Sequence, residues 1–100
     1  MNLIALPDPL AFEWDRGNQT KNFTKHGITI RQAEAVILHP DHITFDDPAH
    51  SAYKKRYVAI GVSINFEILT VVFTIRKNII RIISARSSSK KEKSLYEKTS

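Results

Sequence analysis

The sequence predicts a single small α+β domain, in which an antiparallel sheet packs with two N-terminal helices and one C-terminal helix. Capping residues typical of helix starts occur near both ends of the chain. Between them, residues 56–86 form three runs rich in Val, Ile, Phe and Tyr, which are typical of strands. A chain of 100 residues suffices for one modest core, which we expect to span about residues 11–98.

The first predicted elements are a short strand and a helix. Residues 12–14 are mostly apolar and β-prone, so they predict an opening strand. Asp15 is a suitable N-cap for a helix over residues 16–26. Gly27 then provides the left-handed residue that commonly ends a helix.

A second helix is predicted directly after the first. Thr29 and Gln32 have the spacing of a capping box, which marks the start of this helix. We expect the helix to end at His39-Pro40, because the residue before a proline is disfavoured in helical geometry. One short strand is then predicted around residues 43–45.

The second half of the chain predicts a meander of three main strands and a final helix. The strands are expected at residues 56–64, 66–76 and 79–86, with breaks at Asn65 and Lys77-Asn78. After the last strand, Ser89 and Glu92 form a second capping box. This box starts a C-terminal helix that we expect to extend to about Lys98.

The strand pairing predicts where the arginines point. Two-residue turns in both hairpins place Arg56 opposite Phe73 and Arg86 opposite Leu69. Arg56 and Arg86 then share one face of the sheet, and Arg81 takes the other, because side chains alternate along a strand. The two arginines on the shared face would lie roughly 16 Å apart. This spacing is too long for both guanidinium groups to bind one phosphate directly.

Charge is distributed unevenly along the chain. Residues 1–50 contain four Lys and Arg against seven Asp and Glu, whereas residues 51–100 contain eleven against three. A basic half of this kind indicates a surface for a polyanion such as nucleic acid. A basic C-terminal tail is the alternative reading, because half of the excess comes from Lys90, Lys91, Lys93 and Lys98.

Composition argues against several classes of protein. The chain contains no Cys, which excludes disulfides and thiolate metal sites. Its N-terminus has no signal-peptide pattern, and no run approaches the ~20 apolar residues that span a bilayer. The His and Asp residues between positions 39 and 50 match no familiar zinc spacing, so we predict no metal. We therefore expect a cytoplasmic protein without a cofactor or a membrane segment.

Two motifs near opposite ends of the chain carry a family resemblance. The first is Phe12-Glu13-Trp14-Asp15, followed by Asn22 and Lys25-His26-Gly27. The second is Ile80-Arg81-Ile82-Ile83-Ser84-Ala85-Arg86, which leads into Ser89-Lys90-Lys91-Glu92. In order and spacing, the chain resembles the BrnT family of small ribonuclease toxins from about residue 12 to residue 97.

The resemblance implies a RelE-like endoribonuclease that a cognate BrnA-like antitoxin neutralises, with operator DNA bound only through that antitoxin. Cleaving RNA without a metal needs a group that moves protons and cations that stabilise charge on the phosphorane. His26 and His50 are the candidates for proton transfer, because histidine titrates near neutral pH. The candidate catalytic cations are Arg56, Arg81 and Arg86, and the candidate RNA-binding cations are Lys25, Lys54, Lys55, Arg76 and Lys77.

Structural alternatives exist for most of these residues. Lys25 and His26 also suit a helix C-terminus, where cations are favourable. The arginines also suit ion pairs within the fold, and the candidate acids are Glu13, Asp15 and Glu92. Two aromatic residues could stack on bases. The sequence favours Trp14 as a core residue and Tyr57 as a half-buried strand residue.

One position departs from the family pattern. BrnT-like sequences usually carry Thr-Glu-Arg where this chain has Thr74-Ile75-Arg76. An isoleucine can neither accept a proton nor orient an arginine, so the second hypothesis is a catalytically weakened or inactive antitoxin-binding subunit. A plain RNA-binding module is a third hypothesis, which the lack of an RRM-type aromatic motif disfavours.

Overall fold

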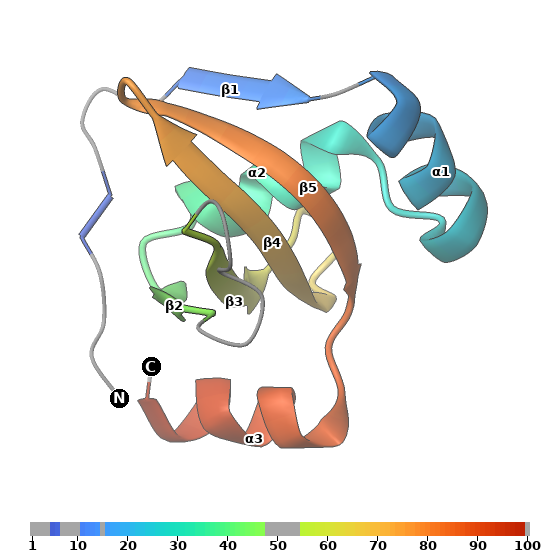
Figure 1. Ribbon diagram of the computed structural model, residues 1–100. Coiled ribbons are helices and arrows are strands. Elements are labelled where there is room, and N and C mark those ends of the chain that lie inside the picture. The colour runs from blue at the N-terminus through green and yellow to red at the C-terminus, as the bar shows by residue number, and fades with distance from the viewer. Residues whose placement is uncertain (1–4, 7–10, 15, 48–54, 100) are drawn as a thin grey trace.

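Helices cover both faces of a five-stranded sheet in the part of the chain that the structure describes (Figure 1). This computed structural model describes residues 5–6, 11–14, 16–47 and 55–99. The elements, in chain order, are β1 (Ala11–Trp14), α1 (Arg16–His26), α2 (Ile30–Leu38), β2 (Ile43–Asp46), β3 (Tyr57–Val62), β4 (Ile68–Arg76), β5 (Ile79–Ser87) and α3 (Lys90–Thr99). The predicted α+β class is confirmed.

The sheet has the strand order β1-β5-β4-β3-β2. Neighbouring strands from β2 to β5 are antiparallel, whereas β1 runs parallel to β5, with Ala11 beside Ile79 and Trp14 beside Ile82. The prediction of a purely antiparallel sheet is therefore wrong at this edge. The apolar pattern of a strand marks its buried face, but it does not specify a distant partner or the direction of that partner.

Local signals place the helix starts as expected. The Thr29 hydroxyl accepts a hydrogen bond from the backbone N–H of Gln32 at 3.2 Å, and the Gln32 side chain accepts one from the N–H of Thr29 at 2.8 Å. This reciprocal pair confirms the predicted capping box. Gly27 has φ +69°, the left-handed conformation expected after α1. The proposed cap Asp15 lies outside the described residues.

Two apolar clusters occupy the two faces of the sheet. The first lies under α1 and α2 and contains Ile28, Ala33, Val36, Ile37, Ala59, Leu69, Val71, Phe73, Ile80, Ile82 and Ala85. The second lies under α3 and contains Ile43, Val58, Ile60 and Tyr96. In Figure 1, α3 crosses beneath the sheet, away from α1 and α2. On β4 this face carries the apolar residues Ile68 and Val72 as well as the polar residues Thr70 and Thr74.

The two hairpins differ in their turns. Lys77 and Asn78 form the predicted two-residue turn, with φ +50° and +65°, as a tight hairpin with the sheet's twist requires. The β3–β4 turn has three residues instead, because the N–H of Ser63 donates to the carbonyl of Glu67 at 2.8 Å. Tyr57, and not Arg56, therefore lies opposite Phe73. The predicted β3–β4 register is wrong by one residue.

A β-bulge changes the face on which the arginines lie. Phe73 pairs with Ile82 but Val72 pairs with Ser84, so Ile83 is an extra residue in β5. Beyond it, Arg86 pairs with Thr70 and not with Leu69. Arg81 pairs with Thr74, as predicted, and Thr70 and Thr74 share a face. Arg81 and Arg86 therefore lie on the same face of the sheet, and their predicted separation onto opposite faces is wrong.

Candidate functional site

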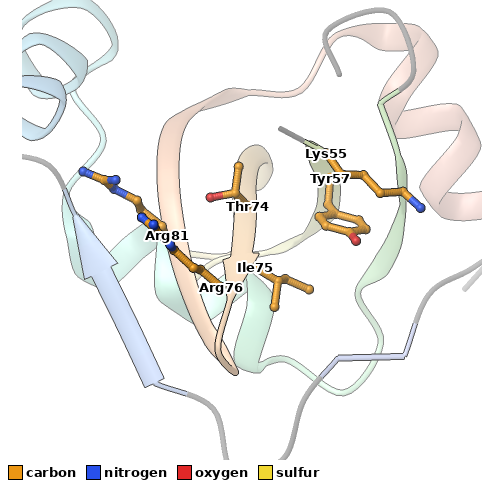
Figure 2. A pocket seen from close by; sticks show the side chains of 6 residues that line it. All are labelled: Lys55, Tyr57, Thr74, Ile75, Arg76 and Arg81. Carbon is orange, nitrogen blue, oxygen red and sulfur yellow. The ribbon is translucent and has the colours of Figure 1, made fainter. Parts of the chain in front are cut away.

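A pocket with a volume of about 270 Å³ lies at the end of β4, and we call it the strand-end pocket. Its lining residues are Lys55, Tyr57, Thr74, Ile75, Arg76 and Arg81 (Figure 2). Three of these are cations that the sequence predicted as functional residues. No acidic side chain is among these described lining residues, although Lys55 and Arg81 each pair with an acid outside the lining.

The pocket lies where β4 extends past the first residue of β3. Residue Tyr57, the first of β3, pairs with Phe73, whereas β4 continues to Arg76. The last residues of β4 therefore extend beyond the paired part of β3. On the other side of β4, Arg81 pairs with Thr74 and brings a guanidinium to the same end of the sheet.

The Tyr57 ring is fixed by its neighbours. It stacks on the buried ring of Phe73, with centroids 5.6 Å apart and planes inclined by 24°. The Lys55 ammonium lies 5.9 Å from the Tyr57 ring centre and 3.6 Å from a carboxylate oxygen of Asp46. Tyr57 is half-buried, as the sequence predicted, and it is also one of the residues that line the pocket.

Arg81 forms an ion pair with an acid that the sequence had named as a possible partner. Its Nε lies 3.4 Å from Oε1 of Glu13, the neighbouring residue on β1. The side chains of Arg81 and Glu13 are 36% and 52% exposed. An ion pair this exposed is weakly held, because water screens both charges.

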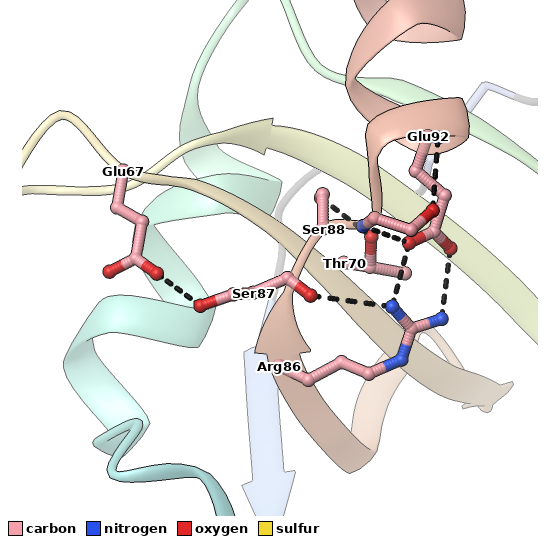
Figure 3. Close-up of polar contacts among 7 residues, drawn as sticks. Glu67, Thr70, Arg86, Ser87, Ser88 and Glu92 are labelled. Carbon is pink, nitrogen blue, oxygen red and sulfur yellow. Dashed lines mark hydrogen bonds and ion pairs between the residues drawn. The ribbon is translucent and has the colours of Figure 1, made fainter.

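Arg86 is held more firmly. Its guanidinium donates two hydrogen bonds to the carboxylate of Glu92, at 2.6 and 2.9 Å (Figure 3). Glu92 also caps α3, because its Oε1 accepts from the N–H of Ser89 at 2.8 Å while the Ser89 hydroxyl accepts from the N–H of Glu92. This confirms the second predicted capping box. This arrangement is the structural ion pair that was the alternative prediction to a catalytic role for Arg86.

The ion pair perturbs both ionisable groups. The hydrogen bonds from Arg86 lower the pKa of Glu92 to about 2, with smaller contributions from the Ser89 N–H and the Thr70 hydroxyl, although burial of the carboxyl acts in the opposite direction. The same pair raises the pKa of Arg86 above its usual value. Thr70 also shares a 2.7 Å hydrogen bond with Ser88, so this network connects α3 to the sheet.

None of the histidines that the structure describes is among the residues that line the strand-end pocket. His26 ends α1, next to Ile28 of the cluster on the opposite face from Arg81. His42 has its Nδ1 2.8 Å from the Thr44 hydroxyl, and burial lowers its pKa, with a further contribution from His39. His50 lies outside the described residues.

The remaining predicted residues are scattered around the fold. Lys25 is exposed in the last turn of α1, and Lys77 is exposed in the β4–β5 turn. Arg56 precedes β3, and its carbonyl accepts from the N–H of Asp47 at 2.9 Å. Lys54 lies outside the described residues. The structure thus brings Lys55, Arg76 and Arg81 together and places Lys25, His26 and Arg86 elsewhere.

One polar residue at the strand-end pocket was missed as a functional candidate, and Asn22 of the first motif has a structural role. Thr74 contributes a hydroxyl to the strand-end pocket, and its predicted pairing with Arg81 was the signal that could have found it. Asn22 is buried, and its side-chain carbonyl accepts from the backbone N–H of Ala85 at 2.8 Å. That bond fixes α1 against β5 near Arg86, so Asn22 has a clear structural function.

Comparison with protein families gives a match over most of the chain. The family "Ribonuclease toxin, BrnT, of type II toxin-antitoxin system" matches residues 14–92. The chain belongs to the BrnT family. A type II system pairs a toxin with a protein antitoxin, so this BrnT-family member is expected to have a protein partner. A search of curated proteins gave no match.

A solved structure has the same fold. It is the 1.1 Å crystal structure of the Brucella abortus ribonuclease toxin BrnT, which is similar to this chain with a TM-score of 0.58. The similarity covers 81% of this chain and 97% of that one, at 24% sequence identity. At this identity the comparison supports the fold of the BrnT-family chain and not the role of any single residue.

No described helix is long and apolar enough to cross a membrane. No group of three or more His, Asp or Glu side chains gathers in the described ranges in a way that could hold a metal ion.

Proposed function

We propose that this BrnT-family chain is a RelE-like endoribonuclease that cleaves RNA without a metal and is neutralised by a BrnA-like antitoxin. The observation that supports the proposal most strongly is the strand-end pocket, which is lined by Lys55, Arg76 and Arg81 together with Tyr57 and Thr74. A cluster of cations without a lining acid favours an RNA phosphate, and the arginine fork suits phosphate oxygens.

In the proposed reaction, the ribose 2′-hydroxyl attacks the adjacent phosphorus. A base takes the 2′-proton, the new oxygen–phosphorus bond forms, and the bond to the 5′-oxygen breaks as an acid protonates that oxygen. The products are a 2′,3′-cyclic phosphate and a 5′-hydroxyl. Arg81 stabilises the negative charge that develops on the phosphorane. Arg56, which directly precedes β3, is proposed to stabilise the same charge.

We propose His50 ahead of His26 for proton transfer. His26 lies on the α1 side of the sheet, away from the face that carries Arg81. His50 precedes Lys55 of the pocket by five residues in the sequence. Lys25, Lys54 and Lys77 are proposed to contact the RNA backbone outside the pocket, where such contacts carry no base specificity. Operator DNA is proposed to be bound only through the antitoxin.

The test is cleavage of end-labelled single-stranded RNA by the purified chain in excess EDTA. Products with cyclic phosphate ends are expected, and Arg81→Ala should reduce the rate by at least tenfold. Arg31→Ala is the matched control, because Arg31 is an exposed arginine on α2. Intact RNA with the wild-type chain would contradict the enzymatic proposal, and equal rates for the two variants would contradict the role of Arg81.

Ile75 favours the second candidate function, an antitoxin-binding subunit with weakened catalysis. Ile75 is among the residues that line the strand-end pocket, and it occupies the position where the family pattern has an acid. If this candidate is right, the wild-type chain binds antitoxin but cleaves RNA slowly, and Ile75→Glu raises the cleavage rate. A decrease in the rate for Ile75→Glu would contradict it.

A further inference from the structure

We infer that the β3–β4 turn is a docking point for the protein antitoxin, and that Ile64 and Phe66 insert into an apolar pocket with an acidic rim on that partner. The inference rests on the proposed toxin–antitoxin function, and it adds which surface of the chain the partner contacts. The family match implies a protein partner but does not say where that partner binds.

Two large apolar side chains are exposed together at this turn. Phe66 is 87% exposed, the highest value among the large apolar residues that the structure describes, and Ile64 is 59% exposed. Single exposed apolar residues are ordinary on a protein surface. Two of them on one three-residue turn form a patch, and apolar patches mark sites of contact with other proteins.

The backbone of the turn gives no reason for phenylalanine at position 66. Phe66 has φ +64°, a left-handed conformation that is unfavourable for a residue with a Cβ atom and easy for glycine. The ring also gains little from packing within the chain, because it is mostly exposed. An unfavourable residue of this kind is typical of functional sites, where a contact outside the chain can account for it.

Hydrogen bonds hold the turn in one conformation. The N–H of Ser63 donates to the carbonyl of Glu67 at 2.8 Å, and the N–H of Phe66 donates to the carbonyl of Ser63 at 3.0 Å. The Ser63 hydroxyl donates to the carbonyl of Gln32 on α2 at 2.8 Å. The Glu67 carboxylate accepts from the hydroxyl of Ser87 (Figure 3). A rigid turn loses little conformational freedom on binding, so its exposed side chains are suited to act as anchors.

Cations flank the turn on two sides. The bond to Gln32 brings the turn to the start of α2, where Arg31 is exposed. At the start of β4, a carbonyl accepts from the N–H of Ser88 at 3.1 Å, and the exposed Lys90 and Lys91 follow in the first turn of α3. Cations are unfavourable at a helix N-terminus, so these lysines do not stabilise α3 itself. An acidic rim on the partner would complement the three charges.

The turn lies far from the strand-end pocket. The two are at opposite ends of β4, a strand of nine residues, and those ends are roughly 26 Å apart (Figure 1). An aliphatic side chain beside an aromatic one suits a protein pocket, whereas a nucleobase stacks on flat rings. The observations therefore favour a protein over RNA at this turn, and loss of the anchor should leave RNA cleavage unchanged.

The test is titration calorimetry of the full chain with the protein encoded by the adjacent reading frame. Phe66→Gly should reduce the affinity at least tenfold and also raise the urea midpoint of unfolding, a combination that misfolding cannot produce. Ile64→Ser should reduce the affinity by about fivefold. Leu38→Ser is its matched control, because Leu38 is 60% exposed at the end of α2, and it should leave the affinity unchanged.

Charge reversal tests the acidic rim separately. Lys91→Glu should reduce the affinity by about threefold at low salt and by less at high salt, because salt screens exposed charges. Lys98→Glu is the control, since Lys98 is exposed in the last turn of the same helix, away from the β3–β4 turn. Equal effects of the two reversals would contradict the acidic rim.

RNA cleavage and sedimentation are measured on the same samples. Equal antitoxin affinities for the wild-type chain and Phe66→Gly would overturn the inference and leave the proposed function intact. Antitoxin binding that depends on Phe66, without any cleavage by the wild-type chain, supports the docking point and contradicts the proposed enzyme. If Phe66→Gly instead abolishes cleavage, or converts a dimer of the chain to monomers, the turn contacts RNA or a second copy and the inference is wrong.

Discussion

The ion pair between Arg86 and Glu92 should contribute measurably to stability, and its contribution can be separated from any contact with RNA. The pair is bidentate, with distances of 2.6 and 2.9 Å, and the two side chains are 42% and 22% exposed. Exposed pairs contribute roughly 0–1 kcal/mol. Hydrogen bonds to charged groups contribute roughly 1.5–3 kcal/mol where they are sheltered. The intermediate exposure here gives an expected coupling of about 1–2 kcal/mol.

A double-mutant cycle measures this coupling. The variants are Arg86→Ala, Glu92→Gln and the double mutant, and the free energy of unfolding is obtained from urea denaturation at pH 7. Glutamine is chosen because its side-chain carbonyl still accepts from the Ser89 N–H, so α3 remains capped. A coupling below about 0.5 kcal/mol would refute the argument that this pair fixes α3 to the sheet.

The pH dependence of stability gives a second measurement of the same pair. The pKa of Glu92 is lowered from 4.5 to about 2 in the folded chain, so the folded state binds this proton less tightly than the unfolded state. The stabilisation is therefore complete above pH 4.5 and is lost as the pH falls toward 2. After allowance for solvent screening, the loss should be about 1 kcal/mol. Glu92→Gln should lack this component.

The cycle also decides whether Arg86 contacts the substrate. Arg86→Ala removes both the structural pair and a cation, so a loss of cleavage in that variant alone is ambiguous. Glu92→Gln leaves the cation in place and releases it from its carboxylate. If Arg86 binds RNA, Glu92→Gln should retain or increase cleavage. If Arg86 is only structural, both variants should lose activity in proportion to their lost stability.

Three further predictions concern stability and RNA binding. Asn22→Ala should destabilise the fold by about 1–3 kcal/mol in urea denaturation, because the buried N–H of Ala85 loses its acceptor, and an unchanged midpoint would contradict this. Phe66→Gly should stabilise the fold by about 0.5–1 kcal/mol, because Phe66 is 87% exposed and has φ +64°, a left-handed conformation that is unfavourable for residues other than glycine. Ile64→Gly on the same turn is the control and should destabilise the fold. RNA affinity should fall as the salt concentration rises, and the logarithm of the binding constant should fall with the logarithm of salt concentration by roughly 0.7 per phosphate contacted. Arg81→Ala should make this slope less steep by about one contact, which a filter-binding titration would measure.

The sequence predicted local features well because they depend on residues only a few positions apart. The capping boxes at Thr29 and Ser89 and the two-residue turn at Lys77-Asn78 each involve side chains within four residues of one another. The three-residue turn was missed because its left-handed position holds Phe66 and not glycine or asparagine, which normally mark it. No apolar pattern reveals such a turn.

Long-range pairings were harder to predict, and the site depends on them. Glu13 was one of the candidate acids, but only the parallel pairing of β1 with β5 places it beside Arg81. The pocket likewise depends on β4 extending past the first residue of β3, which a one-residue error in the turn conceals. The grouping of Lys55, Arg76 and Arg81 at one pocket was therefore not predictable from the sequence.

The bulge at Ile83 has the largest consequence for the proposed site. Without it, Arg81 and Arg86, which are five residues apart on one strand, would point to opposite faces. With it, both lie on the face that α3 partly covers, opposite Thr74 and Thr70, at a separation of about 13 Å along the strand. A chain of unpaired RNA can span that distance with two or more nucleotides. One inserted residue therefore allows a substrate held at Arg81 to continue toward the Arg86–Glu92 pair at the start of α3.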